Sequence, residues 1–196
     1  YQWRSGVKHD CAAVLELSRG GPNIYRNKLG QETALEPEVV HPWFKGTDLK
    51  NDAPATRLSL LLPQTSPGED TARRFQSASQ AWRYLKQHQP FFAARKSSIY
   101  RKRDPFAIFG VGDYTFAPWK VALSALHRQP HFVVVGPEDG RPVLFDDTCY
   151  FIALSSQQEA SIVAQILNSE LCQKFLATLV FPGAKRTVTV ELLQRV

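Results

Sequence analysis

A cationic stretch without any acidic residue is the feature of this sequence with the clearest chemical meaning. No Asp or Glu occurs between Thr71 and Arg103, and six aromatic residues lie in the same stretch. Its basic residues are Arg73, Arg74, Arg83, Lys86, Arg95, Lys96, Arg101, Lys102 and Arg103. Cations displace the counterions condensed on phosphate groups, and flat rings stack against bases. Such a mixture is typical of a surface that binds nucleic acid.

The two halves of this stretch have different interpretations. From Thr71 to His88 the apolar residues recur at helical spacing, which favours a helix with its cations in solvent and its aromatic rings packed inward. The remaining cations follow in a Ser-containing stretch without periodicity, and there we expect phosphate contacts. These contacts are assigned to Arg95, Lys96, Arg101, Lys102 and Arg103. Smaller basic sites recur at Lys8-His9, Lys120, His127-Arg128 and Lys185-Arg186.

No group of residues forms a catalytic or metal-binding motif. Gly110-Val111-Gly112 starts like a dinucleotide-binding loop, but Thr115 stands where a third glycine is needed. The five histidines and three cysteines show no paired metal-ligand spacing. Asp146 and Asp147 are adjacent on an expected strand and would point to opposite faces, so turn capping or a salt link explains them better than a shared metal. We therefore expect no catalytic residue, cofactor or metal in this chain.

The composition describes a folded, basic protein. The 196 residues include 24 Lys+Arg and 18 Asp+Glu, for a net charge of +6 and a pI of about 9.3, and 43% are hydrophobic. This content is sufficient for a packed core. No apolar run approaches the roughly 20 residues that cross a bilayer, and the first residues lack the apolar segment of a signal peptide. Three cysteines, an odd number, favour reduced thiols and a cytoplasmic location.

The elements expected in the first half are short strands followed by one helix. Strands are predicted at 13–17, 38–40 and 57–62, separated by segments rich in Gly and Pro. A helix is predicted over about 70–87, with polar and acidic residues at its start and Pro90 at its end. The chain starts at Tyr1 and has no Met, which suggests that it is a piece of a longer protein.

The second half is expected to contain strands and then two linked helices. Strands are predicted at 105–109, 119–126, 132–135, 143–145 and 148–154, with 136–140 as a hairpin turn. Ser156 and Glu159 fit a capping box, and apolar stripes continue until Phe181-Pro182-Gly183. The predicted class is α+β: a strand-rich mixed β layer over 1–155 with an inserted helix near 70–87, followed by a C-terminal helical hairpin over 156–196.

Four segments together resemble one family. They are the run from Tyr100 to Val121, the segments 6–12 and 145–151, and Ile166-Leu167-Asn168-Ser169. In this order they are similar to the C-terminal target-recognition (specificity) domain of TaqI-like adenine-N6 DNA methyltransferases of bacterial restriction–modification systems. The resemblance covers most of the chain, and its evidence is the ordered set, since no single motif is diagnostic.

The resemblance implies a protein that reads duplex DNA without methylating it. In such enzymes a separate N-terminal methyltransferase domain binds S-adenosylmethionine and carries an [N/D/S]-P-P-[Y/F] motif, which this chain lacks. The partners implied are double-stranded DNA and that N-terminal domain, and no membrane. Residues expected to position the DNA are Lys8, Arg95, Lys96, Arg101, Lys102, Arg103, Lys185 and Arg186. Residues expected to contact or wedge bases are His9, Tyr114, Trp119 and Lys120, with core packing as the alternative for Trp119.

Two other functions stay open at this point. A stand-alone adaptor could hold single-stranded nucleic acid on the same basic stretch, and a nuclease could use Asp146 and Asp147 to bind a divalent metal. Discrimination between short duplex sequences separates DNA reading from the first alternative. Magnesium-dependent cleavage that Asp147→Ala abolishes would favour the second.

Overall fold

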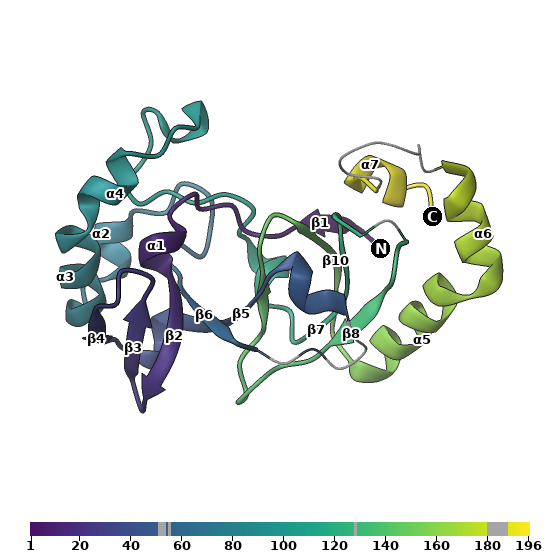
Figure 1. The fold of residues 1–196 in the computed structure, drawn as a ribbon, viewed down its shortest axis with the longest axis horizontal. Helices are drawn as coiled ribbons and strands as arrows, with labels where there is room; N and C mark the ends of the chain where they lie inside the picture. Colours follow the sequence, from purple (N-terminus) through teal and green to yellow (C-terminus); the bar gives the residue numbers. More distant parts are fainter. Residues whose placement is uncertain (51–53, 55, 128, 180–187) are drawn as a thin grey trace. The chain divides into compact units, whose positions relative to one another are not determined.

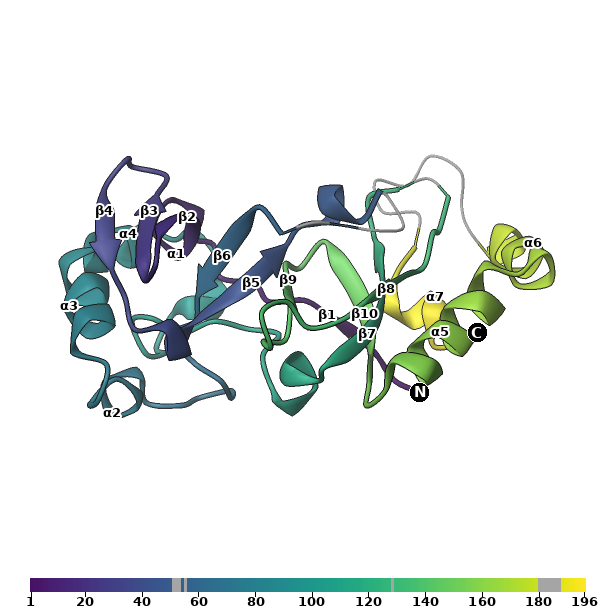
Figure 2. The same ribbon diagram turned by 90° about the horizontal axis from the view of Figure 1, so that it is seen from below.

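The computed structural model describes residues 1–50, 54, 56–127, 129–179 and 188–196, which form two compact units. Unit 1 consists of Tyr1–Gly6, Phe44–Thr56 and Tyr114–Val196, and unit 2 of Val7–Trp43 and Arg57–Asp113. Each unit combines strands and helices, which agrees with the expected α+β class (Figures 1 and 2). The division does not follow the expected boundary between residues 155 and 156, because helices and strands from both sides of it share unit 1.

Unit 1 is built on a four-stranded antiparallel sheet. Its order is β1-β10-β7-β8, from β1 (Trp3–Ser5), β10 (Cys149–Leu154), β7 (Trp119–Ser124) and β8 (Val133–Val135). A short strand, β9 (Leu144–Phe145), lies beside Phe44, whose carbonyl accepts a hydrogen bond from Asp146 N at 3.0 Å. The strands expected around 119–126, 132–135, 143–145 and 148–154 are thus confirmed.

Both faces of the sheet in unit 1 are covered. Val121 and Leu123 of β7 pack with α5 (Gln157–Asn168), whereas Ala122 between them packs with Phe145 and Phe151 on the other face. Alternate strand residues face opposite sides, so burial of both sides requires the continuous apolar run that β7 shows. Two further helices follow, α6 (Glu170–Leu179) and α7 (Val190–Leu193).

The predicted start of α5 is confirmed at the atomic level. The hydroxyl of Ser156 accepts a hydrogen bond from Glu159 N at 3.2 Å, as expected for an N-cap. A break between Asn168 and Glu170 separates α5 from α6, which confirms the two linked helices. The predicted end at Phe181-Pro182-Gly183 lies outside the described residues.

Unit 2 contains an antiparallel sheet of order β4-β3-β2-β6-β5. Its strands are β4 (Glu32–Ala34), β3 (Ile24–Asn27), β2 (Glu16–Gly21), β6 (Leu58–Leu61) and β5 (Val40–Phe44), whose last residue belongs to unit 1. The helices α1 (Ala12–Leu15), α2 (Thr71–Arg74), α3 (Ser79–Gln87) and α4 (Gln89–Ala93) accompany it (Figure 1). The hydroxyl of Tyr84 on α3 donates to Val14 O at 2.8 Å and accepts from the Asn27 side chain at 2.9 Å.

The single helix predicted over 70–87 is wrong. Asp70 caps α2, which ends at Arg74, and α3 begins at Ser79. The Glu36 carboxylate accepts hydrogen bonds from Gln80 N and Ala81 N at 2.7 and 2.9 Å, so a distant residue satisfies the free donors of the second helix. Pro90 does not end the helical region but lies in the first turn of α4, where its missing N–H costs nothing.

Several other predicted elements differ from the structure. Residues 12–15 are helical, and the strand expected at 13–17 starts only at Glu16. Residues 38 and 39 of the strand expected at 38–40 belong to a 3₁₀ turn, Pro37–Val39, and the strand starts only at Val40. The strand expected at 57–62 is confirmed by β6. Residues 105–109 form no strand and make only the bridge between Lys8 and Phe109. The turn at 136–140 does not pair the strands beside it, because β8 pairs with β7.

In the part of the chain that the structure describes, no helix has both the length and the apolar character needed to cross a membrane.

Candidate nucleic-acid interface

Arg95 organises the loop that follows α4 in unit 2. Its guanidinium donates to the backbone carbonyls of Ala107, Pro105, Phe92 and His9 at 2.6, 2.8, 3.1 and 3.2 Å. These four carbonyls come from three separate segments of unit 2. Arg95 therefore ties the loop to its unit and has little remaining hydrogen-bonding capacity for a phosphate.

The environment of Arg95 is that of a structural cation. The guanidinium carbon lies 3.6 Å from the centroid of the Tyr100 ring and 5.3 Å from that of Phe92. Burial lowers the pKa of Arg95, while the nearby Tyr100, Cys11 and Asp10 act in the opposite direction. Charge-assisted hydrogen bonds and ring stacking stabilise a half-buried guanidinium. The expectation that Arg95 positions DNA by direct phosphate contact is thus replaced by a positioning role inside the protein.

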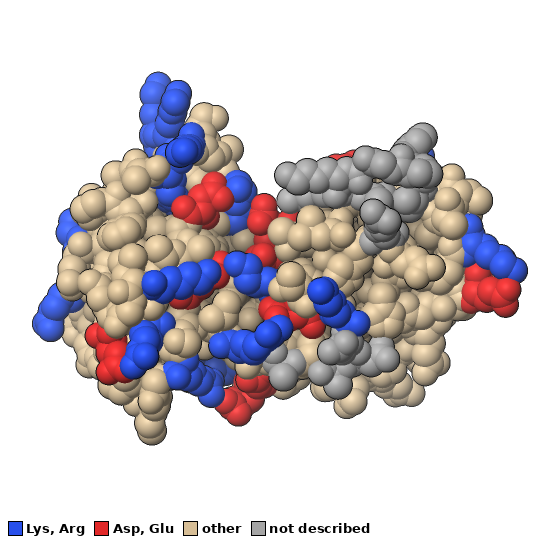
Figure 3. All heavy atoms as spheres, viewed as in Figure 1, with Lys and Arg blue, Asp and Glu red and all other residues tan. Residues whose placement is uncertain are grey.

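The other cations of the loop are on the surface. Lys96, Arg101, Lys102 and Arg103 are all exposed, and no ion pair within the described residues involves them. Figure 3 shows Lys and Arg side chains at the tip of the segment that projects beyond α4 in Figure 1. We call residues 96–103 the basic loop. The structure thus brings these four predicted residues together.

Two backbone features hold the basic loop in shape. Ser98–Tyr100 form a 3₁₀ turn, and Lys102 has φ = 58°, in the left-handed region that residues other than Gly, Asn and Asp rarely adopt. At the end of the loop the Asp104 carboxylate accepts from Phe106 N at 2.7 Å and from the Thr71 hydroxyl at 3.0 Å. The carboxylate of Asp104, the residue after Arg103, is therefore bound to α2 and to its own turn.

A pocket of about 390 Å³ opens beside the basic loop. It is lined by Gln89, Phe92, Ala93, Arg95, Lys96, Ser97, Tyr100, Arg101 and Pro105. Phe92 and Tyr100 contribute aromatic surface, and Lys96 and Arg101 contribute exposed cations at its edge. Rings and cations around a concave surface can hold a phosphate next to a stacked base or sugar.

Lys8 and His9 lie in unit 2 as well, in different environments. The Lys8 ammonium donates to the Asp10 carboxylate at 2.6 Å and its side chain is half-exposed. The backbone of Lys8 pairs with Phe109 at 2.9 Å in both directions. His9 is buried: its Nδ1 accepts from Cys11 N at 3.1 Å and its Nε2 lies 3.6 Å from the Glu16 carboxylate. Because it is buried, His9 does not suit the expected base contact.

Tyr114, Trp119 and Lys120 belong to unit 1. The guanidinium of Arg4 stacks on the Tyr114 ring at 4.6 Å, and burial raises the pKa of Tyr114, which is half-buried. The Trp119 ring fills the space that a side chain at Gly136 would need, with its Cζ3 atom only 2.5 Å from where a Cβ would lie. Trp119 is also half-buried and packs on the core cluster, which agrees with the core-packing alternative.

Lys120 is a buried amine. Only 1% of the residue is exposed, and its Nζ donates to Ala117 O at 2.6 Å. The centroids of Phe145 and Phe151 both lie 6.0 Å from Nζ. Burial lowers the pKa of Lys120 to about 7. The expected contact of Lys120 with a base is therefore corrected, since the amine is enclosed in the core of unit 1. Lys185 and Arg186 lie outside the described residues.

The acidic pair expected to cap a turn does so through Asp146. One of its carboxylate oxygens accepts from Thr148 N at 3.1 Å, from the Thr148 hydroxyl at 2.5 Å and from the Cys149 thiol at 3.4 Å. Among the described residues no cluster of three or more His, Cys, Asp or Glu could hold a metal ion. Cys149 is buried and burial raises its pKa, which makes its thiol a poor nucleophile.

A second group of basic side chains, in unit 1, was not predicted from the sequence. Lys50, His127 and His131 line one pocket, although 77 positions separate Lys50 from His127. In the sequence, His127 is part of the minor basic site His127-Arg128. Local sequence contains no signal that could pair it with Lys50, because the two meet through the sheet of unit 1.

Comparison with known proteins shows a similarity in sequence to a methyltransferase. No protein-family model matches the chain. It is 37% identical over 193 residues to the Type II methyltransferase M.NspV of Nostoc sp. (strain ATCC 29411 / PCC 7524), a match that covers 98% of this chain. The chain spans only 40% of the length of that relative.

A solved structure shares the fold. It is described as the structure of the Type IIL restriction-modification enzyme MmeI in complex with DNA, and it matches 83% of this chain and 20% of that chain. The TM-score is 0.53 and the sequence identity 12%. The sequence similarity confirms the predicted resemblance to a methyltransferase, and the shared fold confirms the α+β class.

Proposed function

We propose that this chain is the target-recognition domain of a site-specific adenine-N6 DNA methyltransferase and reads a short sequence of duplex DNA. The observation that supports this most directly is the basic loop, with four exposed cations on a segment whose shape is fixed by Arg95 and Asp104. The similarity to a Type II methyltransferase over nearly the whole chain gives this surface its context.

The physical requirement for such a domain comes from the chemistry of the target. The amino group of adenine is inaccessible inside the stack, so the base must be extruded at a cost of a few kcal/mol. A domain that grips the flanking duplex offsets this cost. In our proposal Lys96, Arg101, Lys102 and Arg103 contact phosphates and set the register, while side chains beside them read base edges.

In our proposal, methyl transfer takes place in another domain of the parent protein. The relative is considerably longer than this chain, which leaves room for an N-terminal domain that binds S-adenosylmethionine. We propose that domain as the partner of this one, and the cytoplasm as their location. The residues of this chain would then bind and orient DNA without taking part in the reaction.

Duplex binding by the chain itself tests the proposal. Fluorescence anisotropy with a pool of labelled duplexes at 50 to 200 mM salt should show binding, with a preference for a subset of sequences. The double variant R101E/K102E should bind at least tenfold more weakly, and the slope of log affinity against log salt should fall by about two.

A matched control is available on α3 of the same unit. Arg83 and Lys86 are exposed there, and R83E/K86E makes the same change in net charge. We expect this variant to retain most of the affinity, because the helix face is assigned to solvent. Equal losses in both double variants would argue against a specific role of the basic loop. Absence of duplex binding by the wild-type chain at 50 mM salt would refute the proposal.

Binding of single strands and a cleavage assay with magnesium separate the two alternative functions. Tighter binding of single strands than of any duplex would indicate the adaptor function. Magnesium-dependent cleavage abolished by Asp147→Ala would indicate a nuclease, although the engagement of Asp146 in its own turn gives that function no support.

A further inference from the structure

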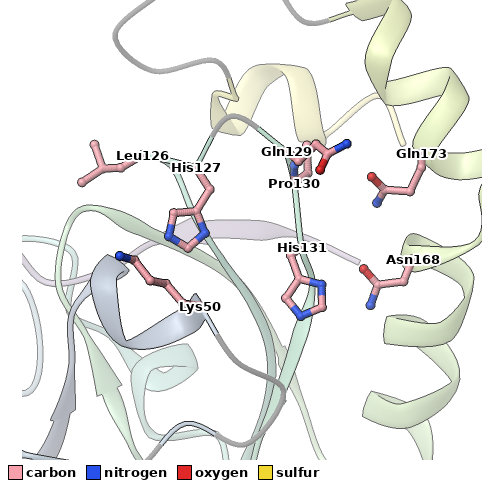
Figure 4. Close-up of a pocket in the computed structure, with 8 residues that line it drawn as sticks. All are labelled: Lys50, Leu126, His127, Gln129, Pro130, His131, Asn168 and Gln173. Atoms are coloured by element: carbon pink, nitrogen blue, oxygen red, sulfur yellow. The ribbon is translucent and has the colours of Figure 1, made fainter.

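Unit 1 contains a pocket of about 860 Å³ with an unusual set of side chains. Lys50 comes from the end of the 3₁₀ segment Gly46–Lys50, and His127 and His131 from the connection between β7 and β8. Asn168 and Gln173 complete the opposite side from α5 and α6 (Figure 4). The described residues that line this pocket include no carboxylate. The polar side chains of its described lining are therefore basic groups and amides, beside the apolar Leu126 and Pro130.

The two amides hold the structure of the pocket. The Asn168 side chain accepts from Phe132 N at 3.1 Å and donates to Phe132 O at 2.8 Å, which fixes the chain next to His131 on α5. The Gln173 amide donates to Leu167 O at 2.9 Å across the break between the helices. These hydrogen bonds hold one wall of the pocket in place. The groups that can carry positive charge are those of Lys50, His127 and His131.

The three basic groups are close enough to affect one another. Burial lowers the pKa of His127, and the charges of Lys50 and His131 lower it further. In Figure 4, Lys50 and His127 lie on one side of the pocket and His131 lies between them and the amides. A bound anion would favour protonation of both histidines.

We propose that the pocket lined by Lys50, His127 and His131 binds a phosphodiester group of the DNA backbone. The inference rests on the proposed function and adds to it a phosphate contact in unit 1, separate from the basic loop of unit 2. Lys50 provides a permanent cation, and the two histidines provide N–H donors whose charge rises as the pH falls.

Single substitutions test this pocket against a matched exposed lysine. The variants K50Q, H127Q and H131Q are compared with K174Q, whose side chain is exposed on α6 of the same unit and pairs with Glu170 at 2.6 Å. At 0.1 M salt, K50Q should lower duplex affinity about threefold and reduce the salt slope by about one, while K174Q should change neither. H127Q and H131Q should weaken binding more at pH 6 than at pH 8.

Inorganic phosphate provides a readout that needs no DNA. In NMR spectra of the wild-type chain, phosphate at pH 6 should shift the ring resonances of His127 and His131, while the buried His9 and His88 of unit 2 should not respond. K50Q should weaken this response. Circular dichroism and thermal unfolding of each variant confirm that the fold is intact.

The outcomes distinguish failure of the pocket from failure of the proposed function. Duplex binding that R101E/K102E weakens, but that all three pocket variants leave unchanged at pH 6, would overturn the pocket and leave the function standing. A wild-type chain that binds phosphate but no duplex would overturn both and assign the pocket to free phosphate.

Discussion

Arg95 of unit 2 is half-buried and Lys120 of unit 1 is buried, and the two cations have opposite kinds of surroundings. Arg95 donates hydrogen bonds to four backbone carbonyls and stacks on the Tyr100 ring, so these partners stabilise its positive charge. Lys120 has a single carbonyl partner, that of Ala117, and otherwise faces the rings of Phe145 and Phe151. The planar guanidinium can donate hydrogen bonds in several directions at once, whereas the compact ammonium is more strongly hydrated and loses more hydration free energy when it is buried.

The difference teaches that a cation removed from solvent can either stabilise the fold through its hydrogen bonds or lower the free energy of unfolding. Arg95 links three segments of unit 2 and stabilises the loop next to the proposed DNA surface. The ammonium of Lys120 loses its hydration and forms few hydrogen bonds that could replace it. Burial therefore disfavours the charged form and lowers the pKa of Lys120. The free energy of unfolding should therefore respond in opposite directions when the two charges are removed.

The largest effect is expected for Arg95→Met. Loss of the guanidinium leaves several carbonyls without a donor, and we expect the free energy of unfolding to fall by about 3 kcal/mol in urea denaturation. Arg101→Met serves as the control, since its side chain is exposed and should change stability by no more than about 0.5 kcal/mol. Similar stabilities for the two variants would remove the distinction between Arg95 and the basic loop.

Lys120→Met should be stabilising, by about 2 kcal/mol at pH 6, because an apolar side chain replaces a buried charge. The folded pKa of about 7 lies below the unfolded value of 10.5. Between these values the unfolded chain binds more protons, so wild-type stability rises with pH across this interval. The advantage of the variant should be greatest below pH 7 and should shrink toward pH 10.5.

Urea denaturation of both proteins at several pH values measures this difference. Lys174→Met, at an exposed site of the same unit, controls for the loss of one charge. A destabilised Lys120→Met variant, or an advantage that grows with pH, would contradict the interpretation.

The smallest effects on stability are expected at Lys102, where charge and backbone conformation can be separated. Asn tolerates the positive φ of this residue, so Lys102→Asn should leave stability within about 0.5 kcal/mol and lower the salt slope of DNA binding by about one. Lys102→Val removes the same charge but should cost about 1 kcal/mol of stability, because a β-branched residue is strained there. Equal stabilities of the two variants would show that this backbone conformation is relaxed.

Local sequence patterns predicted the elements whose partners are near in sequence. The N-cap at Ser156, the apolar strands β7 and β10 and the break before α6 depend on neighbouring residues, and all are confirmed. The division of the predicted 70–87 helix depends on Glu36, which is more than 40 positions from the donors it satisfies. Periodicity contains no information about such a contact.

The candidate site shows the same limit. An acid-free basic stretch correctly located the exposed cations of residues 96–103, because charge density is a local property. It could not separate Arg95 from them, since the carbonyls that enclose Arg95 belong partly to His9 and Ala107. Lys120 was expected to contact a base from beside a loop, but it lies in β7, where the flanking apolar residues are buried on both faces.

The pairing of β1 with β10 sets an order of events during synthesis. Ser5 lies opposite Tyr150 in the register of the two strands, so the first strand emerges from the ribosome long before its partner exists. At 5–20 residues per second this wait lasts on the order of ten seconds. The sheet of unit 1 is therefore completed only after β10 has been synthesised, and a ribosome that stalls before Cys149 would leave β1 without the strand it pairs with.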